Sequence, residues 1–350
     1  MNGEDIIVKT DRHIEVVTTE TAGMKETGFG SVETCRRICD VLKSRYAEVR
    51  FNLVQSERDL QRIVDREPDL VVLCVKYVID EEQDATIWLS DYFSQHGIPH
   101  TGSNRATLEF DSDKSKAKTV LLENGVATAK FFPAHPGLFI KEEHLPLPLP
   151  LFVKPMDAAN GNGVDENSLV HDFASYEAKV EEIFTIYAIP ALVEEVLPGR
   201  EFTVAVFDDS APDGRLIFPV EIVAPRNAKG DRVLGHLAKS SNNEKLSKIE
   251  DGALTAISAL ARKAFSILGM RDFGRIDVMM DAHGVPHFIE TNLVPGLTAD
   301  TSYFPRACNI DGMMSYEAVV LKIVELALNR SMLPAHFKLN RSEPPAYLET

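Results

Sequence analysis

Four polar side chains in the C-terminal third of the chain have the types and spacing of a magnesium site. Arg275 and Asp277 lie two residues apart, as do Glu290 and Asn292. In a strand, residues two apart share one face, so each pair should point the same way. Mg²⁺ binds oxygen ligands, usually one or two carboxylates together with substrate phosphates. The pattern therefore predicts a site for a magnesium nucleotide, and a surface hairpin with ordinary charges is the alternative.

A β-hairpin is predicted to bring the two pairs together. Residues 275–280 are expected to form one strand and residues 287–290 its antiparallel partner, across the turn Asp281-Ala-His-Gly284. Apolar residues flank the polar ones on both strands, which indicates that the hairpin packs against a core. This packing favours the magnesium–nucleotide site over the alternative of a solvated surface hairpin.

Length, composition and charge restrict the class of protein. The chain has 350 residues, of which 44% are hydrophobic and 26% are charged. These values are typical of a globular protein with two or three domains. The formal net charge of −16 argues against non-specific nucleic-acid binding, which requires a basic surface. A polyanionic nucleotide must then be met by local lysines, arginines and metal.

The cysteines and the N-terminus indicate a reduced compartment. The four cysteines form no CxxC pair. Cys35 and Cys39 share a helical face, which could indicate a metal, but small buried residues in a reduced core are the favoured interpretation. The N-terminus lacks the apolar stretch of a signal peptide, and no apolar run approaches the ~20 residues of a membrane helix. We therefore expect a cytoplasmic protein with no membrane partner.

The pattern of elements predicts an α/β protein whose C-terminal half is α+β. In the first third, strands alternate with helices, which predicts an open and largely parallel sheet. The expected strands there are 14–18, 49–54 and 69–75, and the expected helices are 31–44, one opened by Ser56 and Asp59, and 85–95. Further on we expect helices at 113–123, 176–184, 253–268 and 316–329, and strands at 126–132, 151–154, 191–196, 201–207 and 216–223. The polar stretch 224–250 is long enough to predict a functional loop.

Six segments, in the family's order and with spacing that fits it, resemble the D-alanine–D-alanine ligase family of the ATP-grasp superfamily. They are Gly97-Ile-Pro-His-Thr-Gly-Ser103, Asp113-Lys-Ser-Lys116, Pro150-Leu-Phe-Val-Lys-Pro155, Leu192-Val-Glu-Glu-Val-Leu-Pro-Gly-Arg-Glu-Phe-Thr-Val204, Phe273-Gly-Arg-Ile-Asp277 and Phe288-Ile-Glu-Thr-Asn-Leu-Val-Pro-Gly-Leu-Thr298. The resemblance runs from about residue 97 to residue 328. It implies an N-terminal parallel-sheet domain at 1–104, a central ATP-grasp subdomain at 105–189, a C-terminal subdomain at 190–332 and a tail at 333–350.

The resemblance implies a nucleotide site. Lys114 and Lys154 match the family's two phosphate lysines, although a strand-end lysine can also be solvated. Asn160, Gly161 and Gly163 belong to a loop whose backbone N–H groups could fold over phosphates, although most glycine loops are plain turns. Four residues match the hinge that contacts adenine, and a fifth matches the carboxylate on the ribose: Glu194, Glu195, Val196, Leu197 and Glu201. An ordinary acidic strand edge is the alternative for these acids.

The resemblance also implies metal and catalytic residues. Asp277, Glu290 and Asn292 match the Mg²⁺ ligands, with two ions expected and Mn²⁺ as a possible substitute. Arg275 matches the arginine that stabilises the transferring phosphoryl group, and a structural salt bridge to Asp277 is its alternative or additional role. The other matches are the Gly296 N–H for an oxyanion, Lys239 for the γ-phosphate, and Ser302 for the carboxylate of the second substrate.

The implied reaction joins two small amino acids or related substrates. The first substrate's carboxylate attacks the γ-phosphate of ATP to give an acyl phosphate and ADP, and the second substrate's amine then displaces phosphate. Water would destroy the acyl phosphate, so the loop at 224–250 is expected to act as a lid. A homodimer is implied as well.

Several departures concern the choice of substrate. In the family, an N-terminal element presents a glutamate to the amino group of the first substrate. Here Thr21 to Ser31 stands in its place, and Glu26 or Glu33 could substitute for that glutamate. Asn160 and Asn162 replace an acid and a serine, and Ser240 stands where a tyrosine is expected. His236 resembles a lid histidine of relatives that accept a hydroxy acid, and Asp300 lies in a segment one residue longer than the family's.

Three classes of function therefore remain open. A ligase of the same mechanism for other amino or hydroxy acids in specialised metabolism is the nearest alternative to the dipeptide ligase. A catalytically inactive nucleotide-binding protein and an ATP-grasp phosphotransferase are alternatives of another class.

Overall fold

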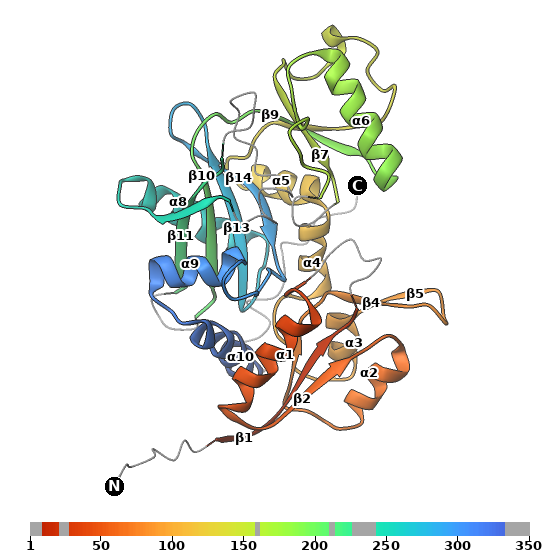
Figure 1. Cartoon of the computed structure of the whole chain (residues 1–350), viewed down its shortest axis with the longest axis vertical. Helices are drawn as coiled ribbons and strands as arrows, with labels where there is room; N and C mark the ends of the chain where they lie inside the picture. The colour runs from red at the N-terminus through yellow and green to blue at the C-terminus, as the bar shows by residue number, and fades with distance from the viewer. Residues whose placement is uncertain (1–8, 21–27, 158–161, 210–213, 226–242, 333–350) are drawn as a thin grey trace.

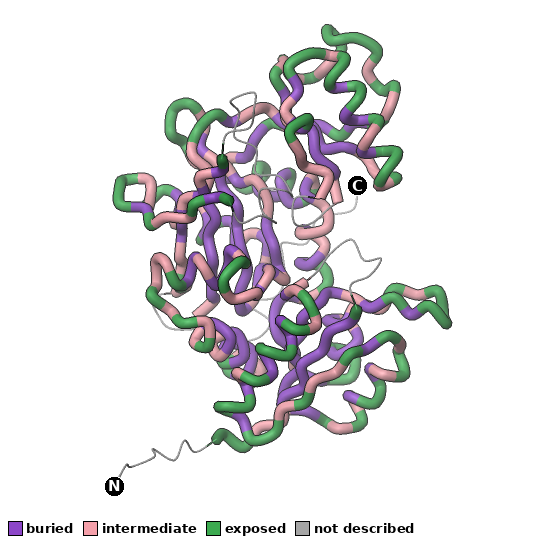
Figure 2. The backbone as a smooth tube through the Cα atoms, viewed as in Figure 1, coloured by how far each residue is buried: buried purple, intermediate pink, exposed green. Residues whose placement is uncertain are grey.

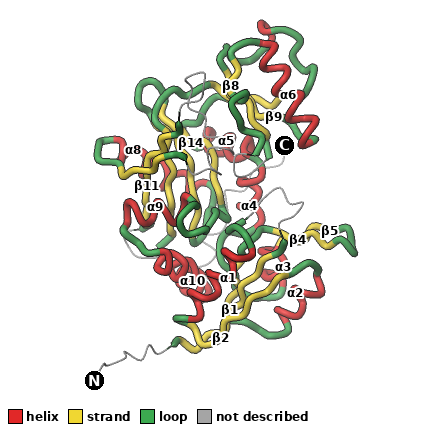
Figure 3. Tube along the Cα trace, in the orientation of Figure 1, coloured by secondary structure: helices red, strands yellow, loops and turns green. Residues whose placement is uncertain are grey.

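Three main sheets follow one another along the long axis of the molecule (Figure 1). The structure is a computed structural model, and it describes residues 9–20, 28–157, 162–209, 214–225 and 243–332. Helices flank the strands of each sheet (Figure 3). Within these ranges, no helix has both the length and the apolar character needed to cross a bilayer.

The N-terminal sheet is parallel, as predicted. Its strand order is β2-β1-β3, with β1 at Thr10–Thr18, β2 at Tyr46–Leu53 and β3 at Leu70–Leu73. Helices α1 (Val32–Lys43) and α2 (Glu57–Val64) connect the strands. Ser56 Oγ accepts a hydrogen bond from Asp59 N, which confirms the predicted start of α2.

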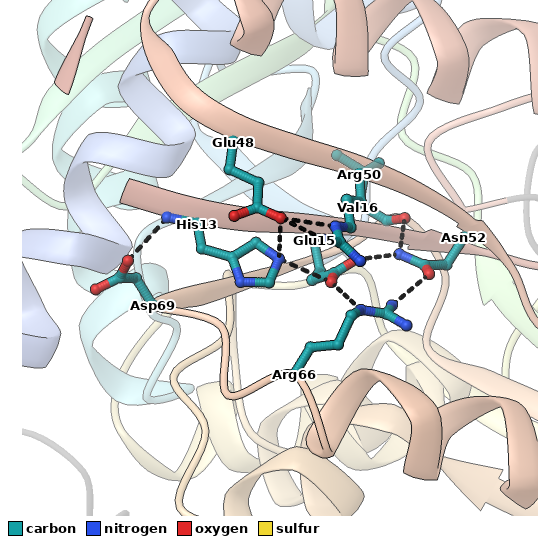
Figure 4. A network of polar contacts seen from close by, with 8 residues as sticks. All are labelled: His13, Glu15, Val16, Glu48, Arg50, Asn52, Arg66 and Asp69. Atoms are coloured by element: carbon teal, nitrogen blue, oxygen red, sulfur yellow. Dashed lines mark hydrogen bonds and ion pairs between the residues drawn. The ribbon is translucent and has the colours of Figure 1, made fainter. Parts of the chain in front are cut away.

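A network of charged groups lies on one face of this sheet (Figure 4). The Glu15 side chain is fully buried, and it accepts hydrogen bonds from Arg66 Nε and Asn52 Nδ2, each at 2.6 Å. His13 Nε2 lies 2.9 Å from the same carboxylate. Burial alone would raise the pKa of Glu15, but the hydrogen bonds from Arg66 and Asn52 lower it below its ordinary value.

The predicted helix at 85–95 is wrong in its first part. Residues Ala85–Trp88 form strand β5, which pairs antiparallel with β4 (Tyr77–Asp80), and helix α3 covers only Leu89–Gln95. Thr86, Ile87 and Trp88 prefer extended backbone, and the Trp88 ring packs 5.6 Å from the Tyr77 ring across the two strands. This hairpin projects from the body of the molecule (Figure 1).

Helices α4 (Arg105–Ser112) and α5 (Lys114–Glu123) lead into a four-stranded sheet. Its order is β6-β9-β7-β8, with α6 (Phe173–Tyr187) packed against it. The strands span Phe131–Ala134 (β6), Leu151–Pro155 (β7), Leu169–Val170 (β8) and Ala191–Glu195 (β9), and a short 3-10 helix spans Glu142–His144.

The predicted strand at 126–132 is also wrong in its first part. Strand β6 begins only at Phe131, because the preceding residues cross to the neighbouring sheet. There Phe288 N donates to Ala127 O at 2.8 Å, and Thr128 forms an isolated bridge to Phe288. Residues 127 and 128 therefore tie the two sheets together.

The third sheet has five antiparallel strands in the order β12-β11-β10-β13-β14. They span Glu201–Phe207 (β10), Leu216–Val223 (β11), Lys245–Lys248 (β12), Phe273–Met280 (β13) and Pro286–Asn292 (β14). Helix α8 (Ala253–Ile267) covers one face, and α9 (Tyr303–Gly312) and α10 (Tyr316–Met332) cover the other.

Both faces of this third sheet carry apolar side chains, because successive residues of a strand point alternately into two hydrophobic cores. Phe202, Val204 and Val206 pack with α8, whereas Ala205 and Phe207 pack with α9 and α10. Figure 2 shows the central strands buried along their length. The sheet is therefore a rigid support for the polar side chains that its strands carry.

Candidate active site

The predicted hairpin is present. Strand β13 pairs with β14 so that Arg275 lies opposite Asn292 and Asp277 lies opposite Glu290. Asp281 Oδ1 accepts hydrogen bonds from His283 N and Val285 N, both at 2.8 Å, and so closes the turn.

Arg275 and Asp277 form a bidentate ion pair. The sequence analysis gave this salt bridge as an alternative or additional role of Arg275, beside the stabilisation of a phosphoryl group. Arg275 Nε and Nη2 each lie 3.0 Å from an Asp277 oxygen. Thr203 on β10 donates to Asp277 Oδ1 at 2.7 Å, and both ends of the pair are buried. Burial alone would lower the pKa of Arg275, but Asp277 and Glu290 raise it. A fixed positive charge is therefore held beside two carboxylates.

Buried lysines converge on the same region from α5 and β7. Lys114 Nζ lies 3.9 Å from Glu290 Oε2. Glu194 on β9 sits between two ammonium groups, at 2.7 Å from Lys118 Nζ and 2.8 Å from Lys154 Nζ. The four-stranded sheet, helix α5 and the hairpin thus supply the charges of one site.

The protonation of these lysines follows from their neighbours. Burial lowers the pKa of Lys118. Burial acts in the same direction on Lys154, but Glu194 and Glu290 outweigh it and raise the pKa of Lys154. Burial would raise the pKa of Glu194, and the two lysines instead lower it. Lys154 therefore stays cationic near the hairpin carboxylates, as a phosphate ligand requires.

Lys118 was missed by the sequence analysis. It is fully buried and also donates to Thr128 Oγ1 at 2.7 Å, in the segment that joins the two sheets. A signal was present, because Lys114 and Lys118 are four residues apart and share one face of α5.

The residues expected at the nucleotide hinge occupy different environments. The Glu194 side chain is buried between lysines, whereas Glu195 is half-buried and accepts from Lys130 N at 2.8 Å. Val196 and Leu197 follow β9 directly, and Glu201 opens β10 with its side chain half-buried.

Part of the predicted phosphate loop is described. Gly163 has a φ of +73°, and a Cβ there would lie 2.4 Å from Pro155 Cγ, so the position requires glycine. Several predicted residues lie outside the described ranges: Asn160, Gly161, Glu26, His236, Lys239 and Ser240.

Gly296 and Ser302 lie next to each other. A Cβ on Gly296 would lie 2.7 Å from Ser302 Oγ. Ser302 Oγ accepts from Thr298 N at 3.0 Å, and within the described ranges no residue accepts its hydroxyl proton. Asp300 and Glu33 are exposed.

The start of α1 is bound to this segment. Leu297 N donates to Phe29 O at 2.7 Å, and the Thr298 and Thr34 hydroxyls lie 3.1 Å apart. The N-terminal domain therefore borders the region of Gly296 and Ser302.

Taken together, these residues form one polar region in which cations and oxygen ligands are held by buried contacts. Two lysines and an arginine can neutralise a polyphosphate, and two carboxylates with an amide can hold a divalent cation. The hydrogen bonds between Arg275 and Asp277 and the contact of Lys114 with Glu290 all lie within this region.

Comparison with known proteins identifies the family. The family model "D-ala D-ala ligase C-terminus" matches residues 124–325. A D-alanine–D-alanine ligase of Methylacidiphilum infernorum is 26% identical over 91% of this chain and 96% of its own length. One of Paraburkholderia phytofirmans is 31% identical over 67% of this chain and 72% of its own.

Solved structures show the same fold. A D-alanine–D-alanine ligase of Bacillus anthracis complexed with ATP aligns with a TM-score of 0.71 at 21% identity, and covers 91% of this chain and 98% of its own. The Coxiella burnetii enzyme aligns with a TM-score of 0.67 at 18% identity, over 95% of this chain and 97% of its own. The ATP-grasp fold predicted from the six segments is confirmed.

Proposed function

The chain belongs to the D-alanine–D-alanine ligase family, and on that basis we propose that it uses ATP to join the carboxyl group of one amino acid, or related acid, to the amine of a second. It is an ATP-grasp ligase that forms carbon–nitrogen bonds. The observation that carries the proposal is the β13–β14 hairpin, which places Arg275, Asp277 and Glu290 close together. Lys114 and Lys154 lie near the carboxylates of this hairpin.

The residues at the hairpin fit a divalent cation. Asp277 and Glu290 are opposite each other in the register, and Asn292 follows two residues later on the same strand. The Asn292 amide nitrogen is buried and has no hydrogen-bond partner in the part of the chain that the structure describes. We assign Asp277, Glu290 and Asn292 to Mg²⁺, with Mn²⁺ as a substitute. A cation there would offset the charge of the phosphates.

The side chains have separate tasks in the proposed first step. Lys114 and Lys154 bind phosphate oxygens, and the backbone at Gly163 lies close to the same phosphates. A carboxylate oxygen of the first substrate attacks the γ-phosphorus, and ADP leaves as the new phosphorus–oxygen bond forms. Arg275 stabilises the charge that develops on the transferring group, because Asp277 holds one edge of its guanidinium in place through two hydrogen bonds.

In the second step, Ser302 holds the carboxylate of the second substrate through its hydroxyl proton. The amine attacks the acyl carbon, phosphate leaves, and the amine loses one proton to give the amide. The Gly296 N–H stabilises the oxyanion of the tetrahedral intermediate. We also propose Glu194, Glu195, Val196 and Leu197 as the adenine hinge, Glu201 as the ribose ligand, and Asn160, Gly161 and Lys239 as further phosphate contacts.

The wider setting is proposed on the same basis. We propose a cytoplasmic homodimer with domains at 1–104, 105–189 and 190–332. A ligase of this mechanism that joins other amino or hydroxy acids is the second candidate, supported by the departures in the substrate segments. Identifying the product separates the two.

The test removes the central charges. Glu290→Gln and Arg275→Ala should each lower ADP release by about 10³-fold or more, since each removes charge stabilisation used in the transition state. ADP and phosphate release should be followed over D- and L-amino acids and hydroxy acids, with mass spectrometry of the product. Glu48→Gln, on an exposed side chain of β2, is the control and should keep wild-type rates.

Two results would contradict the proposal. Wild-type turnover in either variant, with unchanged circular dichroism, would refute the site. A phosphorylated product without amide, or no turnover with any substrate pair, would refute the ligase.

A further inference from the structure

Glu244 is a buried carboxylate to which the proposed mechanism gives no role. The residue is 5% exposed, and Arg306 Nη1 donates to its Oε1 at 3.0 Å. The other oxygen, Oε2, is buried and accepts no hydrogen bond from any residue within the described ranges. Such a half-satisfied carboxylate is unfavourable unless a further donor reaches it.

The Glu244–Arg306 pair adjoins the region assigned to the second substrate. Arg306 lies one turn after Ser302 on α9, and its backbone N–H donates to Ser302 O at 3.3 Å. The Tyr303 ring lies next to both guanidinium groups, with the Arg306 carbon 5.9 Å and the Arg275 carbon 5.5 Å from the ring centroid. Tyr303 therefore joins Glu244 and Arg306 to the catalytic arginine.

Two ion pairs lie at this corner. Asp277 pairs with Arg275 through two hydrogen bonds, and Glu244 pairs with Arg306 through one. Glu244 Oε2 keeps a hydrogen-bonding capacity that no described residue uses. An ionised carboxylate only accepts, so its complement is a hydroxyl or an ammonium group.

We propose that Glu244 recognises a hydrogen-bond donor on the side chain of the second amino acid, so that this enzyme favours a hydroxylated or amino-bearing acceptor over alanine. The inference depends on the proposed ligase function and names the acceptor class for that site. Arg306 acts as a positioning residue, because it holds Oε1 and thereby fixes the direction of Oε2. A site built to bond a polar substrate group rejects an analogue without that group, since its own buried group is then left unpaired.

The experiment compares acceptors at a fixed first substrate. Alanine, serine and 2,3-diaminopropionate, each in both configurations, are tested with the full-length protein and ATP, and kcat/KM is measured for each acceptor. For the wild type we expect serine or diaminopropionate to exceed alanine by about tenfold or more.

Three variants separate recognition from structure. Glu244→Leu should reduce the preference over alanine to about twofold or less, with the change in the acceptor KM rather than in the KM of ATP. Glu244→Gln is isosteric, and should keep the response to serine while losing the preference for the ammonium group. Asp311→Asn removes another carboxylate of α9, which pairs with Lys248 at 3.5 Å, and should leave every ratio unchanged.

The outcomes are distinct. Equal kcat/KM for alanine, serine and diaminopropionate in the wild type would overturn this inference while leaving the ligase function standing. So would an unchanged preference in both Glu244 variants, because Glu244 would then be structural only. Absence of any amide product would overturn the proposed function itself.

Discussion

Replacing Glu194 with glutamine tests how the buried charges at the nucleotide region are held. The Glu194 carboxylate lies within 2.8 Å of two ammonium groups, those of Lys118 and Lys154, and all three side chains are buried. A glutamine at this position would keep the shape but carry no charge, so two buried cations would lose their shared partner. Removing one partner of a buried ion pair costs about 3–5 kcal/mol.

The expected cost lies at the lower end of that range. Glutamine still accepts one hydrogen bond through its amide oxygen, and a buried lysine can release its proton, which burial already favours for Lys118. We therefore expect Glu194→Gln to lower the free energy of unfolding by about 3 kcal/mol at pH 7. It should also raise the KM of ATP, since Lys154 would no longer be held as a cation.

The pH dependence has a definite sign. In the variant, we expect Lys118 and Lys154 to have a lower pKa in the folded chain than in the unfolded chain. As pH rises, the folded chain therefore loses these protons first, and the unfolded chain then binds more protons than the folded one. Stability then rises with pH, and the difference from the wild type should shrink as pH rises toward the unfolded-state pKa of lysine.

Urea unfolding followed by circular dichroism measures the effect, and Glu195→Gln is the matched control. Glu195 is the next residue of β9, but its nearest ammonium group, on Lys130, is 3.5 Å away and 73% exposed. Such a pair is worth about 0–1 kcal/mol. A loss below about 1 kcal/mol in Glu194→Gln, or equal losses in both variants, would refute the reasoning.

Two other buried carboxylates give further predictions. Asp272 accepts hydrogen bonds from Arg330 at 2.8 and 2.9 Å and from Gly102 N at 2.8 Å, so Asp272→Asn should destabilise the fold by about 3–5 kcal/mol in urea unfolding, and an unchanged midpoint would contradict this. Arg66 and Asn52 hold the pKa of Glu15 below its ordinary value, against the effect of burial. The Glu15 carboxylate therefore stabilises the fold fully above its unfolded-state pKa, and this stabilisation is lost as pH falls through its folded-state pKa. A pH series of urea unfolding below about pH 5 should therefore show a steeper loss in the wild type than in Glu15→Gln, and parallel curves would exclude a contribution from Glu15.

The amino-acid sequence alone determined the local elements and the chemistry of the hairpin. Strand β10 and strand β11 were predicted with their observed bounds, and helix α1 differs by one residue at each end, because alternation, periodicity and capping are local properties. The hairpin that carries Arg275 and Asp277 on one strand, and Glu290 and Asn292 at the end of the other, followed from the two-residue period and a short turn. The six spaced segments then indicated the family.

Other features depended on contacts between distant residues. Residues 85–88 form a strand because Tyr77 offers Trp88 a cross-strand partner. Residues 127 and 128 leave the predicted strand because they pair with Phe288 of β14. Lys118 looked like an ordinary charged residue and Glu194 was matched only to the adenine hinge, until α5, β7 and β9 brought three charges within 2.8 Å. Glu244 likewise acquired a meaning only beside Arg306. Short-range patterns select helix, strand and turn, whereas burial and the pairing of charges depend on segments separated by tens of residues, which only the folded chain brings together.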